Sequence, residues 1–597
     1  MKKIKITFYG LFALLLLSIN ACNDDFLNRY PLDQISSAIY FKHASDFELY
    51  ANQFYPRVFW DDATGSTNEG WNGGIYNFEL NSDNMIKLGE PDSRLAGYNS
   101  VPSSGGGWDY SMIRDVNYGI ANKGKCEDDP SQYNQYLGEL YFFRAFAYFK
   151  LVRNFGDVPW VDKPLDPGSE ELYGPRTPRT EVVQHILSDL DSAAMLMNSG
   201  KMDEGTRVSK EVALAFKSRV ALYEGTWEKY HHDDVFKGST DGTDFLKQAA
   251  DAALAVMNSG VYSIHTTGNP TQDYFDLFVQ TDYAGWDEVL LYKKYDRSIG
   301  FVHHHHVASR YPYQKGLTRG LAVSYLSLDG LPRAVSPDFD EALCDSTATY
   351  ESRHLDPRFG QTFASRDAVW AIDQGNPGGD TIYWYEPDVP PHSYMRCVPQ
   401  IIDAKEGRGN TPTGYFRRKA FSPRMDIWKD WSDEDFGVIF IRYGEVLLNY
   451  AEAKAELGTI TQSDIDMSIN VLRDRVAMPH LNMSAIVTDP YWDFPSLSPV
   501  INEVRRERRV ELALENFRLD DILRWAAADE LVAGKTFKGV LYKNGDARVP
   551  VDANGYVDRL RPQLPNGYGF QLDRDYLLPL PNDQLTLNSN LVQNPGW

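Results

Sequence analysis

The sequence contains few groupings of residues that could carry out catalysis or hold a metal ion. It has neither the HExxH zinc motif nor the GxSxG nucleophile motif. Gly534–Thr536 resembles the end of a phosphate-binding loop, but Asp529 occupies the position of that motif's first glycine. His231–Asp234 offers metal-ligand chemistry without a second cluster at a defined spacing, and His303–His306 cannot share one face of a helix or strand. We therefore predict no catalytic site, no metal site and no cofactor, and a solvated or half-buried loop at His303–His306.

Acidic residues could in principle act in pairs to hydrolyse a glycosidic bond. With 83 acidic residues many such pairs can be drawn, so pairing alone has no specificity. Asp552–Gly555 resembles the start of a calcium loop, but the later acidic ligands are not spaced correctly, which favours a tight turn. The basic run Arg505–Arg509 is flanked by acidic residues. Glu503 lies three residues before Arg506, and Arg508 lies three residues before Glu511. That spacing favours a salt-bridged helix over an anion site.

Aromatic residues are the most abundant candidates for contact with a ligand. The chain has 13 Trp, 36 Tyr and 30 Phe, and aromatics make up 13% of its residues. Sugar rings present flat C–H faces that suit aromatic planes, and a few placed polar groups around such a platform give specificity. The candidate ligand contacts, all in or beside segments predicted as loops, are Trp71, Arg94, Tyr98, Asn99, Tyr311, Tyr313, Trp370 and Trp384.

Two of these residues, Trp370 and Trp384, flank the turn-rich segment 373–380. Its Gly, Asn and Pro residues cannot continue a helix, so the segment is expected to fold back on itself. Both rings would then stand at its two stems. With Tyr98 or Tyr311 opposite, they would form a platform on which a ligand ring stacks.

Periodic apolar residues predict a helical scaffold that positions these loops. Small residues within it would let paired helices approach closely, as in helical-hairpin repeats of roughly 34 residues. We therefore predict an all-α, tetratricopeptide-like superhelix carrying large irregular, aromatic-rich loops at 60–118 and 261–440. The expected helices are 137–152, Thr180–Met197, Ser209–Tyr223, Phe245–Asn258, Tyr443–Leu457, Ser463–Arg475 and Ile501–Trp525, the last with a break near Asn516. The first is expected to stop at 154–159, where Gly156 and Pro159 break the helix.

Length and charge narrow the class of protein. A chain of 597 residues exceeds the roughly 250–300 residues that one hydrophobic core supports. A content of 43% hydrophobic and 24% charged residues excludes disorder as the main state. The formal net charge of −23 argues against nucleic-acid binding, because phosphate backbones require a basic surface.

The first residues have the pattern of a bacterial lipoprotein signal. A lysine-rich start precedes the uncharged apolar stretch Phe8–Ile19, which is too short to span a membrane. Ala21 then stands directly before Cys22, which predicts cleavage there and acylation of Cys22. The mature protein would be tethered to a membrane by its lipid. The other three cysteines, Cys126, Cys344 and Cys397, allow at most one disulfide.

Six blocks of sequence resemble the SusD/RagB family of outer-membrane lipoproteins of Bacteroidetes, in that family's order. The start of the mature chain, from Cys22 to Asp33, is also similar. The resemblance lacks a matching block through most of 261–440, where ligand choice would be set. The blocks are Gly138–Trp160, Arg207–Gly225, Ile441–Gly458, Asn470–Val476, Val504–Trp525 and Asp575–Trp597.

The resemblance implies a non-catalytic protein that binds a glycan at the cell surface. Such proteins sit as a lid on a SusC-like TonB-dependent transporter, and Asp24 and Asp25 resemble the signal that directs these lipoproteins to the outer face. Two alternatives stay open: a RagB-like protein that binds peptides, and a surface-tethered all-α glycoside hydrolase. Neither the glycan nor its affinity follows from the sequence.

The same blocks divide the chain and separate core aromatics from candidate ligand contacts. The implied regions are a signal peptide, 1–21, an N-terminal helical region, 22–260, a variable ligand-binding region, 261–440, and a C-terminal helical region, 441–597. Tryptophans inside the matched blocks are expected in the core. Helical spacing of its neighbours favours packing for a further one, Trp108. The six blocks contain Trp160, Trp525 and Trp597, and Trp286 belongs to the short additional match Trp286–Val289 within 261–440.

Overall fold

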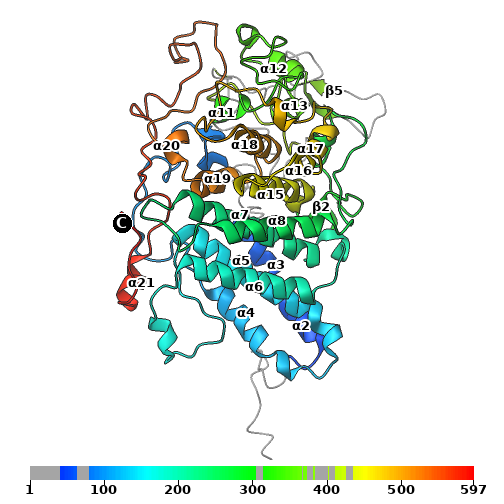
Figure 1. Ribbon diagram of the computed structural model, residues 1–597, viewed down its shortest axis with the longest axis vertical. Helices are drawn as coiled ribbons and strands as arrows, with labels where there is room; N and C mark the ends of the chain where they lie inside the picture. Colours follow the sequence, from blue (N-terminus) through cyan, green and yellow to red (C-terminus); the bar gives the residue numbers. More distant parts are fainter. Residues whose placement is uncertain are drawn as a thin grey trace, which may run out of the picture.

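Helices that pack side by side form most of the computed structural model (Figure 1). Contacts run from α4 to α5, then through α6, α7 and α8 to α15 and α18. In Figure 1, α4 lies low in the view, α7 and α8 at mid-height, and α15 and α18 above them. We call this series the helix stack. Its members are α2 (Ala44–Asn52), α3 (Tyr55–Asp62), α4 (Ser111–Ala121), α5 (Pro130–Phe155), α6 (Arg179–Leu196), α7 (Lys210–Tyr230), α8 (Thr243–Met257), α15 (Tyr443–Glu456), α18 (Pro499–Glu511) and α19 (Arg518–Arg524).

The structure describes most of the chain but leaves out its first 39 residues and parts of the loop-rich segments. Within the described residues, no helix combines the length and hydropathy needed to cross a membrane. The described ranges are 40–62, 79–303, 314–365, 367–372, 381–383, 401, 411–424 and 434–597.

The longest helix, α5, shows how the sequence sets its own limits. Asp129 caps its start, accepting a hydrogen bond from the Ser131 backbone N–H at 2.9 Å, and Pro130 occupies the first helical position. Gly156, with φ of 70°, ends it. The predicted stop at this glycine is confirmed. Between these limits the buried face carries apolar residues from Leu137 onward.

Small residues bring α7 and α8 into close contact, as predicted. A Cβ atom on Gly242 would stand 2.0 Å from the carbonyl oxygen of Gly225. A side chain at position 242 would therefore prevent the start of α8 from lying this close to α7. Gly242 also has φ of 77°, which favours glycine. Along α8, Ala249 and Ala253 are fully buried against this neighbour.

Two predicted helices are interrupted. The break near Asn516 is confirmed: α18 ends at Glu511, Leu514 and Asn516 adopt positive φ, and α19 begins at Arg518. The single helix predicted over Ser463–Arg475 is wrong, because two short helices, α16 (Gln462–Asp466) and α17 (Ile469–Arg475), occupy it. Between them, the Ser468 hydroxyl donates to the carbonyl of Asp464, a local bond that competes with helix continuation.

A loop-rich layer covers one end of the helix stack, with α12, α13 and β5 at the top of Figure 1. Within the described residues its regular structure consists of short helices and two-stranded antiparallel sheets. Because these sheets are small and helices form the scaffold, the predicted all-α, tetratricopeptide-like architecture is confirmed. The helices of the layer are α9 (Asp273–Asp276), α11 (Arg319–Ala322), α12 (Thr349–His354) and α13 (Pro357–Thr362). The paired strands are β1 (Met85–Lys87) with β3 (Lys315–Leu317), β2 (Val289–Lys293) with β6 (Val438–Arg442), and β4 (Val369–Ile372) with β5 (Thr381–Tyr383).

Three hydrophobic cores lie within the described residues. The largest runs through the helix stack and joins residues from Phe41 to Leu580. It crosses the predicted boundaries at 260 and 440, so the division into regions stays a prediction about sequence blocks. Two smaller cores lie in the loop-rich layer, one around Tyr325 and Phe359 and one around Tyr283 and Phe436.

Candidate functional site

Tyr98 is the most exposed of the candidate ligand contacts that the structure describes. Its side chain is 65% exposed, although its backbone N–H donates to the Ser93 carbonyl at 2.8 Å. Asn99 lies half-buried beside it, and its Oδ1 accepts a hydrogen bond from the Ser93 hydroxyl at 2.6 Å. These bonds hold the segment in one conformation. An exposed ring on a fixed backbone costs little entropy to bind.

Arg94 was predicted as a ligand contact, and the structure corrects this. Its side chain is buried, with Nε donating to the Asp575 carbonyl at 2.7 Å and Nη2 to the Tyr576 carbonyl at 2.6 Å. A buried guanidinium needs such partners, and both of these belong to the C-terminal segment. These bonds give Arg94 a role in positioning the segment of Tyr98, and they leave its guanidinium little access to a ligand.

The described segments that follow Trp71 and Tyr313 lie side by side. Trp71, Tyr311, Tyr313 and Trp384 lie outside the described residues, as does Cys22. The chain after Trp71 leads into β1 and the chain after Tyr313 leads into β3, and these strands pair with Ile86 opposite Gly316. The segment around Tyr415 joins them through a bridge to Leu317. Segments that are far apart in sequence therefore meet at one small sheet.

The described strands on either side of residues 373–380 pair with each other, as the predicted fold-back requires. These strands, β4 and β5, pair antiparallel, with Val369 opposite Tyr383. Trp370 lies on β4, and only its backbone is described. Val369, which precedes Trp370, thus pairs with Tyr383, which precedes Trp384. Tyr98 belongs to a different segment, which Arg94 holds against the C-terminal part of the chain.

A buried ion-pair network joins the loop-rich layer to the helix stack. Glu511, at the end of α18, contacts Arg475 at 2.6 Å, Arg442 at 2.8 Å and Arg358 at 2.9 Å. Burial alone would raise the pKa of Glu511, but these guanidinium groups, Arg475 foremost, hold that pKa well below its usual range. The predicted pair of Glu511 with Arg508 is wrong, because each side chain has partners on other elements.

Arg508 turns instead to the next helix, where its Nε lies 3.0 Å from Asp521. The predicted pair of Glu503 with Arg506 is confirmed at 3.2 Å. Every residue from Asn502 to Glu511 is buried, so α18 is a salt-bridged helix in the interior of the protein.

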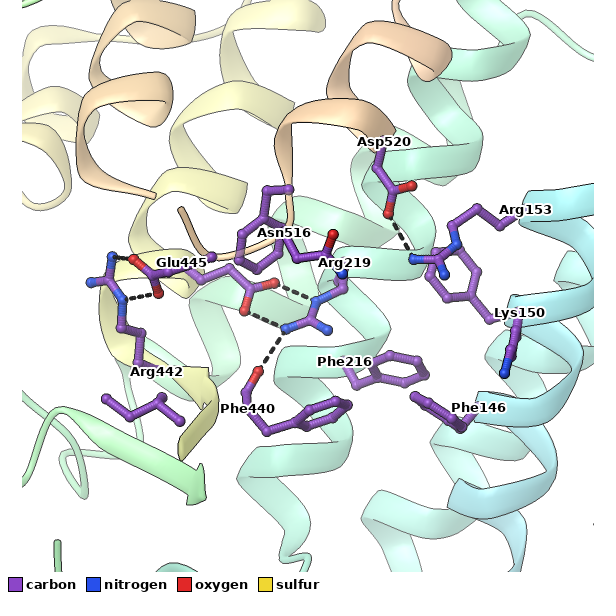
Figure 2. A pocket seen from close by; sticks show the side chains of 14 residues that line it. Phe146, Lys150, Arg153, Phe216, Arg219, Phe440, Arg442, Glu445, Asn516 and Asp520 are labelled. Carbon is purple, nitrogen blue, oxygen red and sulfur yellow. Dashed lines mark hydrogen bonds and ion pairs between the residues drawn. The ribbon is translucent and has the colours of Figure 1, made fainter. Parts of the chain in front are cut away.

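Figure 2 shows a small pocket between α5, α7, β6 and the start of α19. Arg219 makes two contacts with Glu445, at 2.6 and 2.7 Å, and donates to the Phe440 carbonyl at 3.2 Å. Arg153 donates to Asp520 at 3.0 Å. The free volume is about 70 Å³, which accommodates a few water molecules but no sugar ring. We interpret this pocket as part of the packing between helices.

The histidines with metal-ligand chemistry are used in packing. His231 is buried, with Nδ1 bonded to Asp234 and Nε2 donating to the Leu523 carbonyl at 2.8 Å. His303 was expected in a solvated or half-buried loop, but it is buried, and burial lowers its pKa to about 3. Residues 304–306 lie outside the described part. No group of three His, Cys, Asp or Glu among the described residues could hold a metal ion.

The remaining expectations concern the turn at Asp552 and the tryptophans. Asp552 accepts hydrogen bonds from the backbone N–H groups of Asn554 and Tyr556, so the predicted tight turn is confirmed. Trp525 is 3% exposed and lies in the main core, as predicted. The other four are partly buried and pack on the surface of a core or against the chain near it: Trp108, Trp160, Trp286 and Trp597.

Comparison with known proteins shows the family to which this chain is similar. A model of the SusD family matches residues 224–597, well over half of the chain. The chain belongs to the SusD family. A second family model, described as starch-binding associating with outer membrane, matches residues 107–222. The family predicted from six sequence blocks is therefore confirmed, and the two matches together take in the helix stack from α4 onward.

Individual SusD-like proteins are similar along their whole length. SusD-like protein P2 of Formosa agariphila is 26% identical over 626 aligned positions that span both chains completely. A solved SusD-like carbohydrate-binding protein of Bacteroides fragilis has a TM-score of 0.68 at 22% identity, covering 92% of this chain and 99% of that one. A laminarin-binding SusD-like protein has a TM-score of 0.54 at 19% identity, covering 93% and 100%. These two likenesses establish the SusD-like fold.

Proposed function

We propose that this SusD-family protein is a non-catalytic, lipid-anchored glycan-binding protein of the outer membrane, facing the cell exterior. It captures oligosaccharide or polysaccharide and delivers it to a SusC-like TonB-dependent transporter. The observation that carries the proposal is the SusD family match over residues 224–597. The lipoprotein pattern ending at Cys22 supports the anchor. A tethered binding protein cannot itself move a ligand across a membrane, which supports the need for a transporter.

The proposed binding platform lies in the loop-rich layer and at Tyr98. Support comes from the exposure of Tyr98 and from the pairing of β1 with β3, which brings together the segments that follow Trp71 and Tyr313. Asn99 beside Tyr98 supplies a carboxamide for sugar hydroxyls. Tyr311, Trp370 and Trp384 remain proposed members of the platform.

A glycan screen on the full-length lipoprotein in detergent tests the proposed ligand class. We expect retention of at least one oligosaccharide without release of reducing ends. A hydrolase would release them, and a peptide-binding protein would retain peptides from a parallel library and no glycan; either result contradicts the proposal.

Substitutions then test the platform. Truncating an aromatic anchor costs roughly 2 kcal/mol of binding, about thirty-fold in affinity. We expect this from Tyr98→Ala, Trp370→Ala or Trp384→Ala, with the melting temperature unchanged. Tyr491→Ala is the matched control, because Tyr491 is also exposed, at 46%. If all three variants bind glycan as the control does, the platform is misplaced.

Two cell-based measurements test anchoring and delivery. Cys22→Ala should remove the protein from the outer membrane and from protease-accessible positions on whole cells. Purification in mild detergent at native expression should bring down a large β-barrel partner. Recovery of a lone monomer across several detergents would contradict the transporter partnership.

A further inference from the structure

A cleft of about 590 Å³ lies on the flank of the helix stack and shares no lining residue with the small pocket of Figure 2. It is bounded by the start of α4, the connection 159–173 and α21 (Asn582–Leu587), which Figure 1 shows at the left edge of the stack. Small-molecule sites measure roughly 300–1,000 Å³, so this volume suits a saccharide of a few rings. Every residue that lines the cleft is described.

Two aromatic rings form one wall, and both are held from behind. Trp108 contacts Phe155 edge-on, with ring centroids 5.0 Å apart. Tyr110 packs edge-on against Tyr148 at 6.2 Å, and its hydroxyl donates to the Pro159 carbonyl at 3.1 Å. The centroids of Trp108 and Tyr110 are 5.7 Å apart. Because these rings are already fixed, a ligand that stacks on them loses little free energy to ordering the site.

Exposed apolar side chains form the opposite rim. Leu172, Tyr173 and Leu587 are 46%, 53% and 69% exposed. Their backbone is nonetheless fixed, because buried Asn588 donates to the Gly174 carbonyl at 2.9 Å and Asn590 donates to the Tyr173 carbonyl at 2.7 Å. Exposed apolar groups gathered around one cleft indicate a contact surface.

Polar groups at the cleft are suited to hydroxyls. The Asp109 carboxylate is held by the backbone N–H and the hydroxyl of Ser111, at 2.8 and 2.9 Å, and its side chain faces solvent. The Gln584 side-chain amide lines the cleft and takes part in none of the hydrogen bonds between described residues. A carboxylate and a free carboxamide supply both acceptors and donors.

The charges around the cleft balance. Lys163 pairs with Glu171 at 2.6 Å, and the Nε of Arg114 lies 3.4 Å from Asp115. No single sign dominates the rim, so it would not select an anionic or a cationic ligand. The ligand that fits is uncharged, with flat apolar faces and many hydroxyls.

We propose that this cleft is a second saccharide-binding site, which takes a short uncharged oligosaccharide. One sugar ring stacks on Trp108 and a second contacts Tyr110, whose plane is tilted by 55° from that of Trp108. Tyr173 covers the rim, and Asp109 and Gln584 bond the hydroxyls. The ligand class rests on the proposed function, whereas the site itself rests on the cleft. Two sites on one protein would raise its avidity for a polysaccharide that reaches both.

The test uses fluorine NMR of the full-length protein labelled with 5-fluorotryptophan and titrated with maltoheptaose and laminarihexaose. Trp108→Phe assigns the Trp108 resonance. We expect saturable movement of this resonance with at least one of the two saccharides. The double variant Tyr173→Ala/Gln584→Ala should weaken that response at least tenfold at an unchanged melting temperature. Tyr98→Ala should leave it unchanged, and Tyr491→Ala serves as the control.

Each further outcome decides between the two proposals. Binding of either saccharide by calorimetry with a stationary Trp108 resonance overturns the second site and leaves the proposed function intact. A Trp108 resonance that responds to decanoate micelles but to neither saccharide overturns the assigned ligand class. Binding of peptides and of no saccharide overturns both proposals.

Discussion

Helices α8 and α18 of the helix stack are held in place by different forces. Helix α8 packs through apolar and small side chains, among them Phe245, Leu246 and Ala249. Helix α18 packs through charges, because the continuous buried run Asn502–Glu511 contains four arginines and three glutamates. Helix α8 keeps an exposed face that includes Asp244, Lys247 and Asp251, whereas every residue of the charged run Asn502–Glu511 is buried. Charge density along a helix therefore does not indicate exposure when each charge has a partner.

The difference changes what a substitution does. In α8 the loss of a methyl group removes contacts with its neighbours, and the energy follows the buried volume. In α18 the loss of one charge strands its partners in the interior, where desolvation is not compensated. The following predictions, ordered from the largest expected effect to the smallest, measure this difference.

Glu511→Gln should have the largest effect. It removes the carboxylate shared by Arg358, Arg442 and Arg475. Breaking a buried pair costs about 3–5 kcal/mol. Urea denaturation at pH 7 measures the free energy of unfolding. A loss below about 1 kcal/mol, within the range of exposed pairs, would show that the network contributes little.

Leu140→Ala tests apolar packing in the main core. Leu140 lies on α5 and is fully buried in the main core. Truncation should lower the free energy of unfolding by about 2–5 kcal/mol through lost contacts and a cavity. The same loss should be measured at pH 7 and at pH 3.5, because no charge is involved. A loss that changed with pH would break the proposed distinction between apolar and charged packing.

Asp83 should make the charged packing of α18 sensitive to acid. Burial raises its pKa, but Arg509 and then Arg518 lower it to about 2. A folded pKa below the unfolded value stabilises the protein above that unfolded value, and the contribution is lost as pH falls toward 2. The contribution is about 2 kcal/mol. Asp83→Asn should therefore be less stable than the wild type at pH 7, with the gap closing between pH 4 and pH 2 in thermal unfolding.

Glu127→Gln should have the smallest effect. Glu127 pairs with Lys42 at 3.0 Å, and the two side chains are 62% and 46% exposed. Exposed pairs contribute about 0–1 kcal/mol. The same urea titration provides the matched control for Glu511→Gln. If both variants lost equal stability, burial would not be the reason for the difference.

Local patterns in the sequence sufficed for the limits of many helices. The stop of α5 at Gly156 and the break near Asn516 follow from residues within one turn of each other, so periodicity and glycine positions revealed them. Ser468 was missed because a hydroxyl bonding to the backbone leaves the apolar period intact.

Partners far apart in sequence could not be predicted. Arg94 lies beside an exposed tyrosine in the sequence, yet its guanidinium bonds to carbonyls 481 and 482 positions away. The proposed cleft likewise depends on Asn588 holding Gly174 across 414 positions. No periodicity connects such segments. Trp108 was correctly expected to pack, but one sequence pattern cannot show that a ring also faces a cleft.

Asp83 pairs with Arg509 and Arg518 across 426 and 435 positions of the sequence. This separation has a consequence for the order in which parts of the chain fold. Synthesis delivers the chain from its N-terminus, so helices α4 to α8 can meet their neighbours early. Closing loops of this length is slow, and the partners of Asp83 and Arg94 emerge in the last fifth of the chain. We therefore expect the segment that presents Tyr98 to be fixed last, and a chain cut short before residue 509 to build helices α4 to α8 without completing the proposed binding surface.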